Sequence, residues 1–438
     1  MYTGRTAMPC ARFVATSAAL TLASAALLVG QRPADPVSTR HPAIEYATRP
    51  TTDPVALLNQ RIAGGEVQLV FEPGQGYLRS VLNALKVPVE SQLLVYSETS
   101  LQSEFITEKT PRALYFNDTT SVGWVKAADT LELAAWDPQQ GQVFYQLDQK
   151  PAPRPHFNKT QRCLECHEGT LTMGISGMMT MSMLPLSDNP NEYAQGWVVD
   201  QRTPLEDRWG GWFVTGAAVP TRHLGNVPVY HVKRSGVRAI AAPKLTSVAA
   251  RIDASAYPTP YSDVVALMVL NHQTLMTNLI TRLNWATRVQ DYDRLHPAAP
   301  VRQASMQATD DPVANTALEL VDHLLFIDEV PLDGRILGNA GFAEAFSAQG
   351  PKDTKGRSLR ELDLTRRLMK YPCSYLIYSP AFDALPARAK TLVYDRLWTV
   401  LSGKTDDPAY TKLSAADRQA IIEILRDTKP DLPAAFRL

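Results

Sequence analysis

The sequence predicts an α+β fold in which a β-rich N-terminal part precedes a helical C-terminal domain. Between residues 66 and 150, short apolar runs alternate with Asn, Asp, Pro and Gly, a pattern typical of antiparallel strands. After about residue 260, apolar residues recur at i, i+3 and i+4, which is the spacing of amphipathic helices. The chain has 438 residues, 45% of them hydrophobic, and this length favours two or three domains.

The N-terminal end predicts an exported protein. Arg5 and Arg12 introduce a stretch whose residues 13–29 are apolar and uncharged. Such a stretch is typical of a signal peptide or of a short membrane anchor. We therefore expect residues 1–31 to direct the chain to the periplasm, where this segment is either cleaved or retained as an anchor. Residues 32–54 are rich in proline, serine and threonine and predict a flexible linker.

A β-rich domain is expected over residues 55–150. Its first element is a helix that ends at Gly64–Gly65, because glycine commonly follows the last helical turn. These elements predict an antiparallel sheet covered by one or two helices. Its strands are expected at Val67–Phe71, Gln92–Tyr96, Ala113–Phe116, Leu131–Leu133 and Val143–Tyr145.

Two further segments complete the expected organisation. Residues 151–245 form a central segment that follows the break at Pro151–Pro155 and contains strands at 194–200 and 211–218. Residues 255–438 form a helical domain. Its helices are expected at 262–283 with Ser262 as N-cap, near 311–325, and at 359–369, 387–401 and 414–425.

The central segment contains the sequence Cys163-Leu164-Glu165-Cys166-His167, a Cys-x-x-Cys-His motif. This is the attachment motif of c-type haem. Each thiol adds to one vinyl group on one edge of the porphyrin, and the two intervening residues form a turn that places both sulfurs along that edge. The adjacent histidine then gives its imidazole to the iron. The motif therefore predicts one covalent haem c, bound by Cys163 and Cys166, with His167 as the proximal iron ligand.

Three alternative roles of the cysteine pair fit the sequence less well. A thioredoxin-type dithiol needs a βαβ setting, whereas a proline-rich loop precedes these cysteines. A structural zinc site needs four close ligands, and completing such a set with His156 requires a forced geometry. A disulfide between cysteines at this spacing is sterically poor outside redox motifs.

The sixth position of the iron has two candidate ligands. Met179 belongs to a group of methionines after the motif, and a methionine opposite a histidine raises the reduction potential of a haem. His223 precedes Gly225–Asn226 in a loop sequence that suits close approach to a flat cofactor. The alternatives are adaptable core packing for Met179 and an ordinary surface histidine for His223. His272, on the apolar face of a helix, is expected to be a core histidine.

Arginines near the motif are candidate partners for the haem propionates, because guanidinium groups bind carboxylates in bidentate fashion. For each of them an ordinary ion pair or a solvent-facing position is the alternative. The arginines are Arg162, Arg202, Arg208 and Arg222.

Several stretches of the chain resemble a family of exported bacterial proteins with a cytochrome c-like domain. The family pattern after the motif is similar to Gly177-Met178-Met179, and it keeps Met179 as a ligand candidate alongside His223. Many relatives have a second histidine where this chain has Ala217–Ala218, so the resemblance assigns no role to that loop. It implies haem binding and electron transfer, and it implies no substrate. The resemblance covers most of the chain from about residue 66 and lies in Pro111–Asp118, Val122–Val125, Cys163–Gly169, Glu206–Gly216, Arg222–Asn226 and Tyr371–Tyr378.

Together these observations predict a periplasmic monohaem c-type cytochrome that exchanges electrons with a redox partner protein. The formal net charge is zero, from 44 basic and 44 acidic residues, and nothing in it indicates a nucleic-acid partner. Most of the chain lies outside the motif, which leaves two alternatives open. One is a haem-dependent oxidoreductase or peroxidase with an open iron site, and the other is a haem-based sensor or interaction protein.

Overall fold

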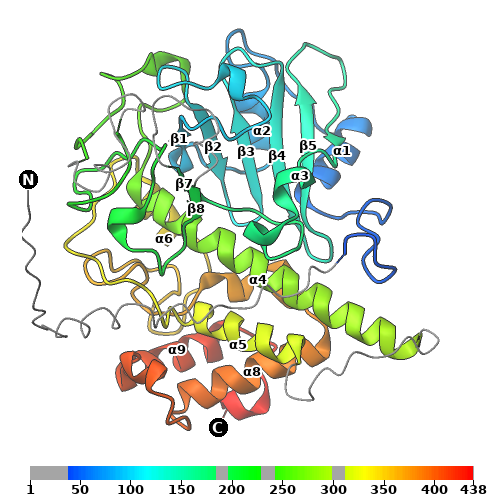
Figure 1. The fold of residues 1–438 in the computed structure, drawn as a ribbon, viewed down its shortest axis with the longest axis vertical. Helices are drawn as coiled ribbons and strands as arrows, with labels where there is room; N and C mark the ends of the chain where they lie inside the picture. The colour runs from blue at the N-terminus through cyan, green and yellow to red at the C-terminus, as the bar shows by residue number, and fades with distance from the viewer. Residues whose placement is uncertain (1–37, 184–195, 228–241, 298–310, 438) are drawn as a thin grey trace, which may run out of the picture. The chain divides into compact units, whose positions relative to one another are not determined.

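The computed structural model describes residues 38–183, 196–227, 242–297 and 311–437, which lie within one compact unit. The architecture is α+β, as the sequence predicts: a six-stranded antiparallel sheet in the N-terminal part is followed by helices (Figure 1). The expected export segment and the start of the linker lie outside the described residues. The boundaries between the expected domains stay predictions.

The sheet is a meander in which each strand pairs antiparallel with the next one along the chain. Four of the expected strands form, and β4 and β5 extend well beyond their predicted bounds because their ladder continues to the turn at Asp137–Gly141. The strands are β1 (Leu93–Val95), β2 (Arg112–Phe116), β3 (Thr120–Trp124), β4 (Thr130–Asp137), β5 (Gly141–Asp148) and β6 (Asn158–Lys159).

Two strands differ from the sequence prediction. The strand expected at Val67–Phe71 does not form: Val67 and Phe71 pack half-buried against the first core as irregular chain. Conversely, β3 was not predicted from the sequence, in which Ser121 and Gly123 alternate with the apolar residues. Val122 and Trp124 are the two large apolar residues of this five-residue strand, which is too short an alternation to identify a strand.

Helices α1 (Pro54–Ala63) and α2 (Leu78–Ala84) cover one face of the sheet, which confirms the expected covering helices. Asp53 caps α1 by accepting hydrogen bonds from the N–H groups of Val55 and Ala56, and the helix ends before Gly64. Alternate strand residues point into this first core. They include Leu94, Tyr115, Val122, Leu133, Val143 and Tyr145.

The opposite face of the sheet packs in part against the long helix α4 (Val264–Leu295). Trp136 of β4 reaches this helix, where its indole N–H donates to Thr281 Oγ1 over 3.0 Å. By length and composition α4 is the one helix in the described ranges suited to cross a membrane, and its most apolar window is wholly buried inside the protein. A helix that is buried on every side lies at the centre of a large core.

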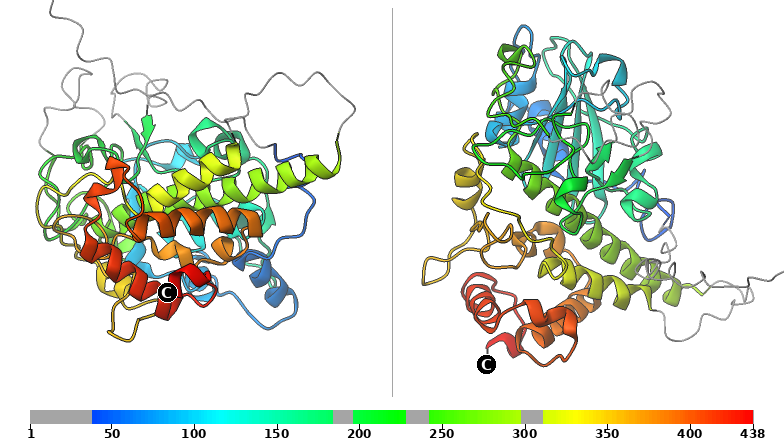
Figure 2. Two further views of the ribbon diagram at one scale, coloured as in Figure 1. Left: turned by 90° about the horizontal axis from the view of Figure 1, so that it is seen from below. Right: turned by 60° about the vertical axis from the view of Figure 1, so that its left-hand side comes forward.

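On its far side, α4 contacts α5 (Pro312–Leu324) and α8 (Ala387–Leu401), and α8 contacts α9 (Ala415–Thr428). Figures 1 and 2 show α4 running between the sheet and these helices. The three helices confirm the helical character expected of the C-terminal part. Asp311 and Ser414 are the N-caps of α5 and α9.

The helix expected at 359–369 does not form. The chain there turns back on itself, so that Leu362 pairs with Met369, and Leu364 adopts a left-handed backbone conformation with φ 57°. Short helices α6 (Phe342–Ser347) and α7 (Pro380–Asp383) flank this irregular stretch.

In the central segment, β8 (Gly196–Val198) pairs with β7 (Met181–Met183), which confirms a strand within 194–200. The strand expected at 211–218 is replaced by irregular chain. The side chain of Asn226 binds both the N–H and the carbonyl of Val214, over 2.7 and 2.8 Å. This amide takes the hydrogen bonds that a neighbouring strand would otherwise supply.

The N-cap of α4 is Asp263, one residue after the expected Ser262. Ser262 Oγ donates instead to the carbonyl of Phe213 and accepts the N–H of Leu94, so it ties the start of the helix to β1. Asp263 is fully buried. Its carboxylate accepts hydrogen bonds from four backbone N–H groups, those of Val265, Ala266, Asn339 and Ala340.

Removing this carboxylate is expected to destabilise the protein strongly. Asp263→Ala leaves four N–H groups without their acceptor in the core, so we expect a loss of about 2–4 kcal/mol in the free energy of unfolding. Ser414→Ala, at the exposed N-cap of α9, is the control and should cost about 1 kcal/mol. Urea unfolding measures both, and equal losses would contradict the central role of Asp263.

Candidate haem site

The Cys-x-x-Cys-His motif forms a single helical turn. Helix α3 spans Leu164–His167, and Cys163 precedes it with helical dihedrals, φ −64° and ψ −24°. Both cysteines of the motif are free thiols; Cys163 is half-buried and Cys166 is exposed. Burial raises the pKa of the Cys163 thiol to about 11, so it stays protonated at neutral pH. Two thiols three residues apart on one turn lie on the same side of it.

The imidazole of His167 is oriented by a hydrogen bond to the main chain. Its Nδ1 lies 2.9 Å from the carbonyl oxygen of Gly177. Since a carbonyl only accepts, Nδ1 carries the proton and the lone pair is on Nε2. The ring rests on Phe144 of β5, with 4.9 Å between the ring centroids. Burial lowers the pKa of His167, which favours the neutral form that binds metals.

The loop between His167 and Gly177 is closed by its own hydrogen bonds. The N–H of Gly177 donates back to the carbonyl of His167 over 3.0 Å, and Glu168 pairs with Ser176 as an antiparallel bridge. Inside the loop, the buried hydroxyl of Thr172 lies 2.9 Å from the carbonyl of Ile175 and accepts the N–H of Gly169. The loop therefore brings Gly177 back beside His167, and the carbonyl of Gly177 orients the imidazole of that histidine.

The same loop is attached to the sheet. Ser176 Oγ donates to the carbonyl of Gln142 at the start of β5 over 2.6 Å, and the N–H of Gln142 donates to the carbonyl of Ser176. Tyr46 adds a third connection, because its hydroxyl donates to the same Gln142 carbonyl. These bonds fix the loop on β5, the strand that also supplies Phe144.

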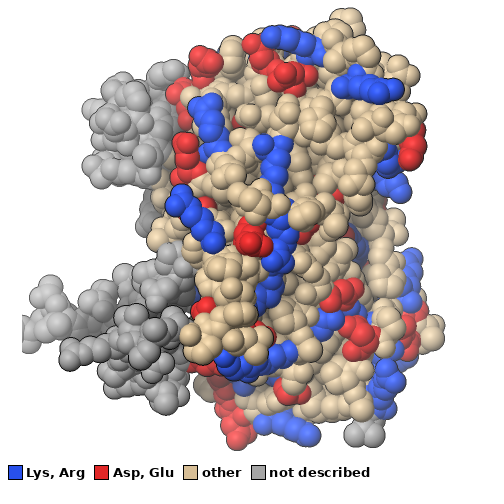
Figure 3. Space-filling view, turned by 90° about the vertical axis from the view of Figure 1, so that its right-hand side faces the viewer, with Lys and Arg blue, Asp and Glu red and all other residues tan. Residues whose placement is uncertain are grey.

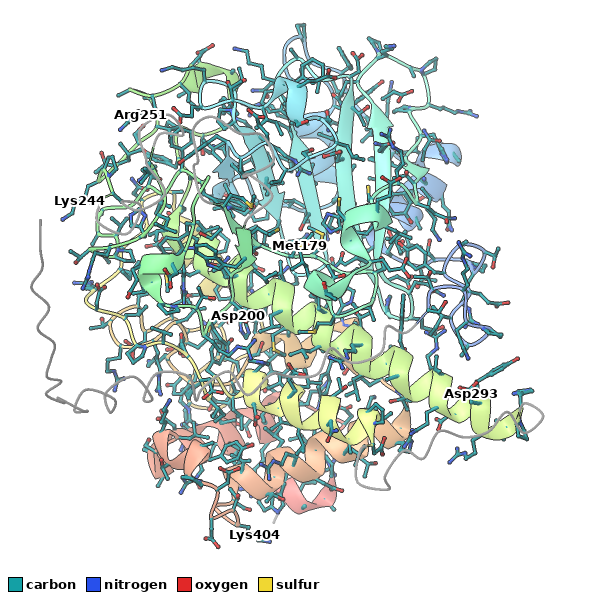
Figure 4. The ribbon with its side chains drawn as sticks, in the orientation of Figure 1. Met179, Asp200, Lys244, Arg251, Asp293 and Lys404 are labelled. Atoms are coloured by element: carbon teal, nitrogen blue, oxygen red, sulfur yellow. The ribbon has the colours of Figure 1, made fainter. Side chains whose placement is uncertain are left out.

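Met179 lies two residues beyond Gly177 and is half-buried. The main chain of its neighbour Met178 is held by Asn278 of α4, which accepts the Met178 N–H and donates to its carbonyl. Gly177 permits this contact, since a Cβ there would lie 2.4 Å from Asn278 Oδ1. Figure 4 shows Met179 between the strands and α4. The structure therefore brings Met179 into the same region as the motif.

His223 has different surroundings. It is buried against Trp209, and its Nδ1 accepts the N–H of Gly225 over 3.0 Å. With Nδ1 acting as acceptor, the proton of the neutral ring is on Nε2, so neither nitrogen has a free lone pair. His223 therefore has the opposite tautomer from that of His167. No contact in the described part of the chain joins His223 to the motif.

The other expected residues make internal contacts. His272 is a satisfied core histidine: Nδ1 lies 2.6 Å from Gln201 and Nε2 lies 2.7 Å from Ser374. Arg202 binds Asp200 in an ion pair of 2.7 Å, and the buried Arg208 donates to main-chain carbonyls. The guanidinium groups of these two arginines are therefore already paired with other groups of the protein.

An ion pair near the motif was not expected from the sequence. Arg112 of β2 binds Glu132 of β4 over 2.7 Å, and the charges of both residues act on Cys163 and His167. No local pattern connects these residues, or Phe144, to the motif. The strand pairing alone brings them to it.

Within the described ranges, no three His, Cys, Asp or Glu side chains are placed to share a metal ion. The motif and His156 are accordingly not grouped as a set of metal ligands in this part of the chain. Comparisons with known protein families, with curated proteins and with solved structures found no match to this chain.

Acid is expected to destabilise the protein through its buried histidines. Burial lowers the pKa of His223 to about 4 and that of His272 to about 3, against about 6.5 in an unfolded chain. The unfolded state therefore binds more protons below pH 6.5. The stability contributed by these neutral histidines is fully present above pH 6.5. The free energy of unfolding then decreases as the pH drops toward 4, by up to about 1.4 kcal/mol per pH unit for each histidine.

Urea unfolding of His223→Gln at about pH 7 and pH 5 measures this effect. We expect the variant to lose less stability between the two pH values than the wild type does. His296→Gln, at an exposed histidine, is the control and should keep the wild-type dependence. The same pH dependence in all three proteins would show that His223 protonates normally in the folded state.

Proposed function

We propose that this protein is an exported c-type cytochrome that carries single electrons through one haem bound at Cys163, Cys166 and His167. The observation that carries the proposal is the combination of two free thiols on one helical turn with a histidine whose Nδ1 is held by Gly177. This leaves Nε2 of His167 available as an iron ligand. Hydrogen bonding of the second ring nitrogen is the usual way in which a protein orients a ligating histidine.

Cys163 and Cys166 attach the group covalently. Each sulfur forms a bond to one vinyl carbon while the proton of the thiol goes to the other carbon of that double bond, so no oxidant is consumed. When bound, a haem of this kind supplies a one-electron iron couple. The carbonyl of Gly177 accepts a hydrogen bond from Nδ1–H of His167, which would increase the electron donation of that imidazole to the iron.

Met179 is the better of the two candidates for the sixth position. It follows Gly177 closely, and its main-chain neighbour is fixed to α4 by Asn278. His223 would have to give up its hydrogen bond with Gly225 and change tautomer before Nε2 offered a lone pair. A methionine ligand also suits an electron carrier, since it raises the reduction potential.

A basic surface next to the motif suits an acidic redox partner. The chain from Gln149 to Arg162 contains no Asp or Glu, and the exposed Lys150, Arg154 and Arg162 form no ion pair with any described residue. Figure 3 shows the face at the right-hand side of Figure 1, on which Lys and Arg side chains are numerous and Asp and Glu side chains lie among them. Opposite charge on a partner would steer its approach to the exposed Cys166 edge. The proposed periplasmic location depends on the export segment expected from the sequence at residues 1–31.

Loss of the motif thiols is expected to abolish covalent haem. After expression with a haem-attachment system, Cys163→Ala/Cys166→Ala should yield protein whose mass under denaturing conditions equals that of the chain alone. The pyridine haemochrome assay should give no covalent haem. Cys373→Ala, at a buried thiol, is the control and should keep one haem per chain. Covalent haem in the double variant would overturn the proposal.

Met179→Ala is expected to open the sixth position. The wild type should be low-spin in both oxidation states and inert to CO and peroxide, and Met179→Ala should become high-spin and bind CO. His223→Gln should keep the wild-type spectrum. If the wild type itself binds CO and reacts with peroxide, the protein is a haem oxidoreductase or sensor and not a simple carrier. If instead His223→Gln opens the iron, His223 is the ligand.

A further inference from the structure

The ion pair between Arg112 and Glu132 spans three strands of the sheet beside the motif. Nη2 of Arg112 on β2 donates to Glu132 on β4, and the guanidinium crosses Gly123 on the strand between them. A Cβ at position 123 would lie 2.5 Å from that nitrogen, so glycine makes the crossing possible. The two side chains are 23% and 11% exposed, so the pair is partly buried and part of the Arg112 side chain is accessible.

The register of the strands places this pair on the same face as His167. Glu132 lies opposite Gly123 and Gln146, and Phe144 lies opposite Ala134, two residues further along β4. Residues two apart on a strand share a face, so Glu132 and Phe144 point the same way. Because His167 rests on Phe144, the ion pair and the histidine belong to one surface.

This surface contains polar atoms that the described protein leaves without partners. Nε of Arg112 and both amide atoms of Gln102 are buried and form no hydrogen bond with any described residue. Gln102 belongs to the same region, because its N–H donates to Ser100 Oγ, which lies 3.5 Å from Glu132. Its side chain is nine-tenths buried, at 8% exposure. Each such group costs about 1–3 kcal/mol when nothing completes it.

We propose that Arg112, held by Glu132, binds a propionate carboxylate of the haem attached at the motif. This inference rests on the haem attachment proposed above. The planar guanidinium matches a carboxylate in a bidentate pair. Glu132 occupies one of its N–H groups and keeps the rest oriented. The arginines expected from the sequence for this role, Arg202 and Arg208, are already bonded within the protein.

Arg112 consequently affects the midpoint potential of the iron in addition to anchoring the propionate. Reduction removes one positive charge from the site, so a nearby guanidinium stabilises the reduced state and raises the midpoint potential. The effect is strong at a partly buried position, where solvent screens charges less.

The test compares midpoint potentials of holoproteins by spectroelectrochemistry. Arg112→Gln should keep one covalent haem and have a lower midpoint potential than the wild type. Arg112→Lys keeps the charge but loses the bidentate pair, so its potential should fall between the two. Arg112→Gln/Glu132→Gln removes both members of the ion pair. Its potential should stay below that of the wild type, because the propionate has lost its partner.

Arg367→Gln is the matched control. Arg367 binds Asp417 over 2.7 Å with both side chains 19% exposed, in the helical part of the chain, and its loss should leave the potential unchanged. A double variant that returns to the wild-type potential would show that Arg112 serves only to neutralise Glu132. An unchanged potential in Arg112→Gln would also overturn the inference. Absence of covalent haem from the wild type would instead overturn the proposed function.

Discussion

The hydrogen bond between Nδ1 of His167 and the carbonyl of Gly177 determines the chemistry that the motif offers. It fixes the tautomer, leaves Nε2 free and orients the ring on Phe144. A bond of this kind is reliable only when the acceptor cannot move. The bridge between Glu168 and Ser176 and the attachment of Ser176 to β5 supply that rigidity. The sheet therefore acts on the motif through this short loop and through the direct contact between Phe144 and His167.

The two faces of the sheet have separate roles. One face is closed by α1 and α2 and forms an ordinary apolar core. The other combines an apolar half, where Trp136 meets α4, with a polar half that holds Arg112 and Glu132. An isolated ion pair of this burial adds little to stability. Its position beside His167 and the unpartnered atoms around it instead suit the binding of an anionic group.

The helical part is integrated with the sheet. Helix α4 is buried because its two sides pack against different layers, the strands on one side and α5 and α8 on the other. Asn278 of this helix also holds the main chain of Met178. Direct hydrogen bonds thus join α4 to the segment that carries Met179. These bonds connect the large C-terminal part physically to the candidate site.

Features that depend on residues close together along the chain could be predicted from the sequence. The motif at residues 163–167, the positions of α1, α5, α8 and α9, and most strands of the sheet all follow from local spacing and local chemistry. His272 was also predictable, because a histidine on an apolar helix face lies in the core. The irregular chain at 211–218 and 359–369 was not, since side-chain hydrogen bonds and tight turns there override the apolar pattern.

The groups that surround the motif come from distant parts of the chain, and the fold alone identifies them. The pairing of β2, β3 and β4 brings Arg112 and Glu132 to the motif, and no spacing in the sequence encodes that proximity. The fold likewise distinguishes two histidines that look alike in the sequence. Which ring nitrogen carries the proton depends on the partner of the other nitrogen. For His167 the partner is the carbonyl of Gly177 and for His223 it is the N–H of Gly225.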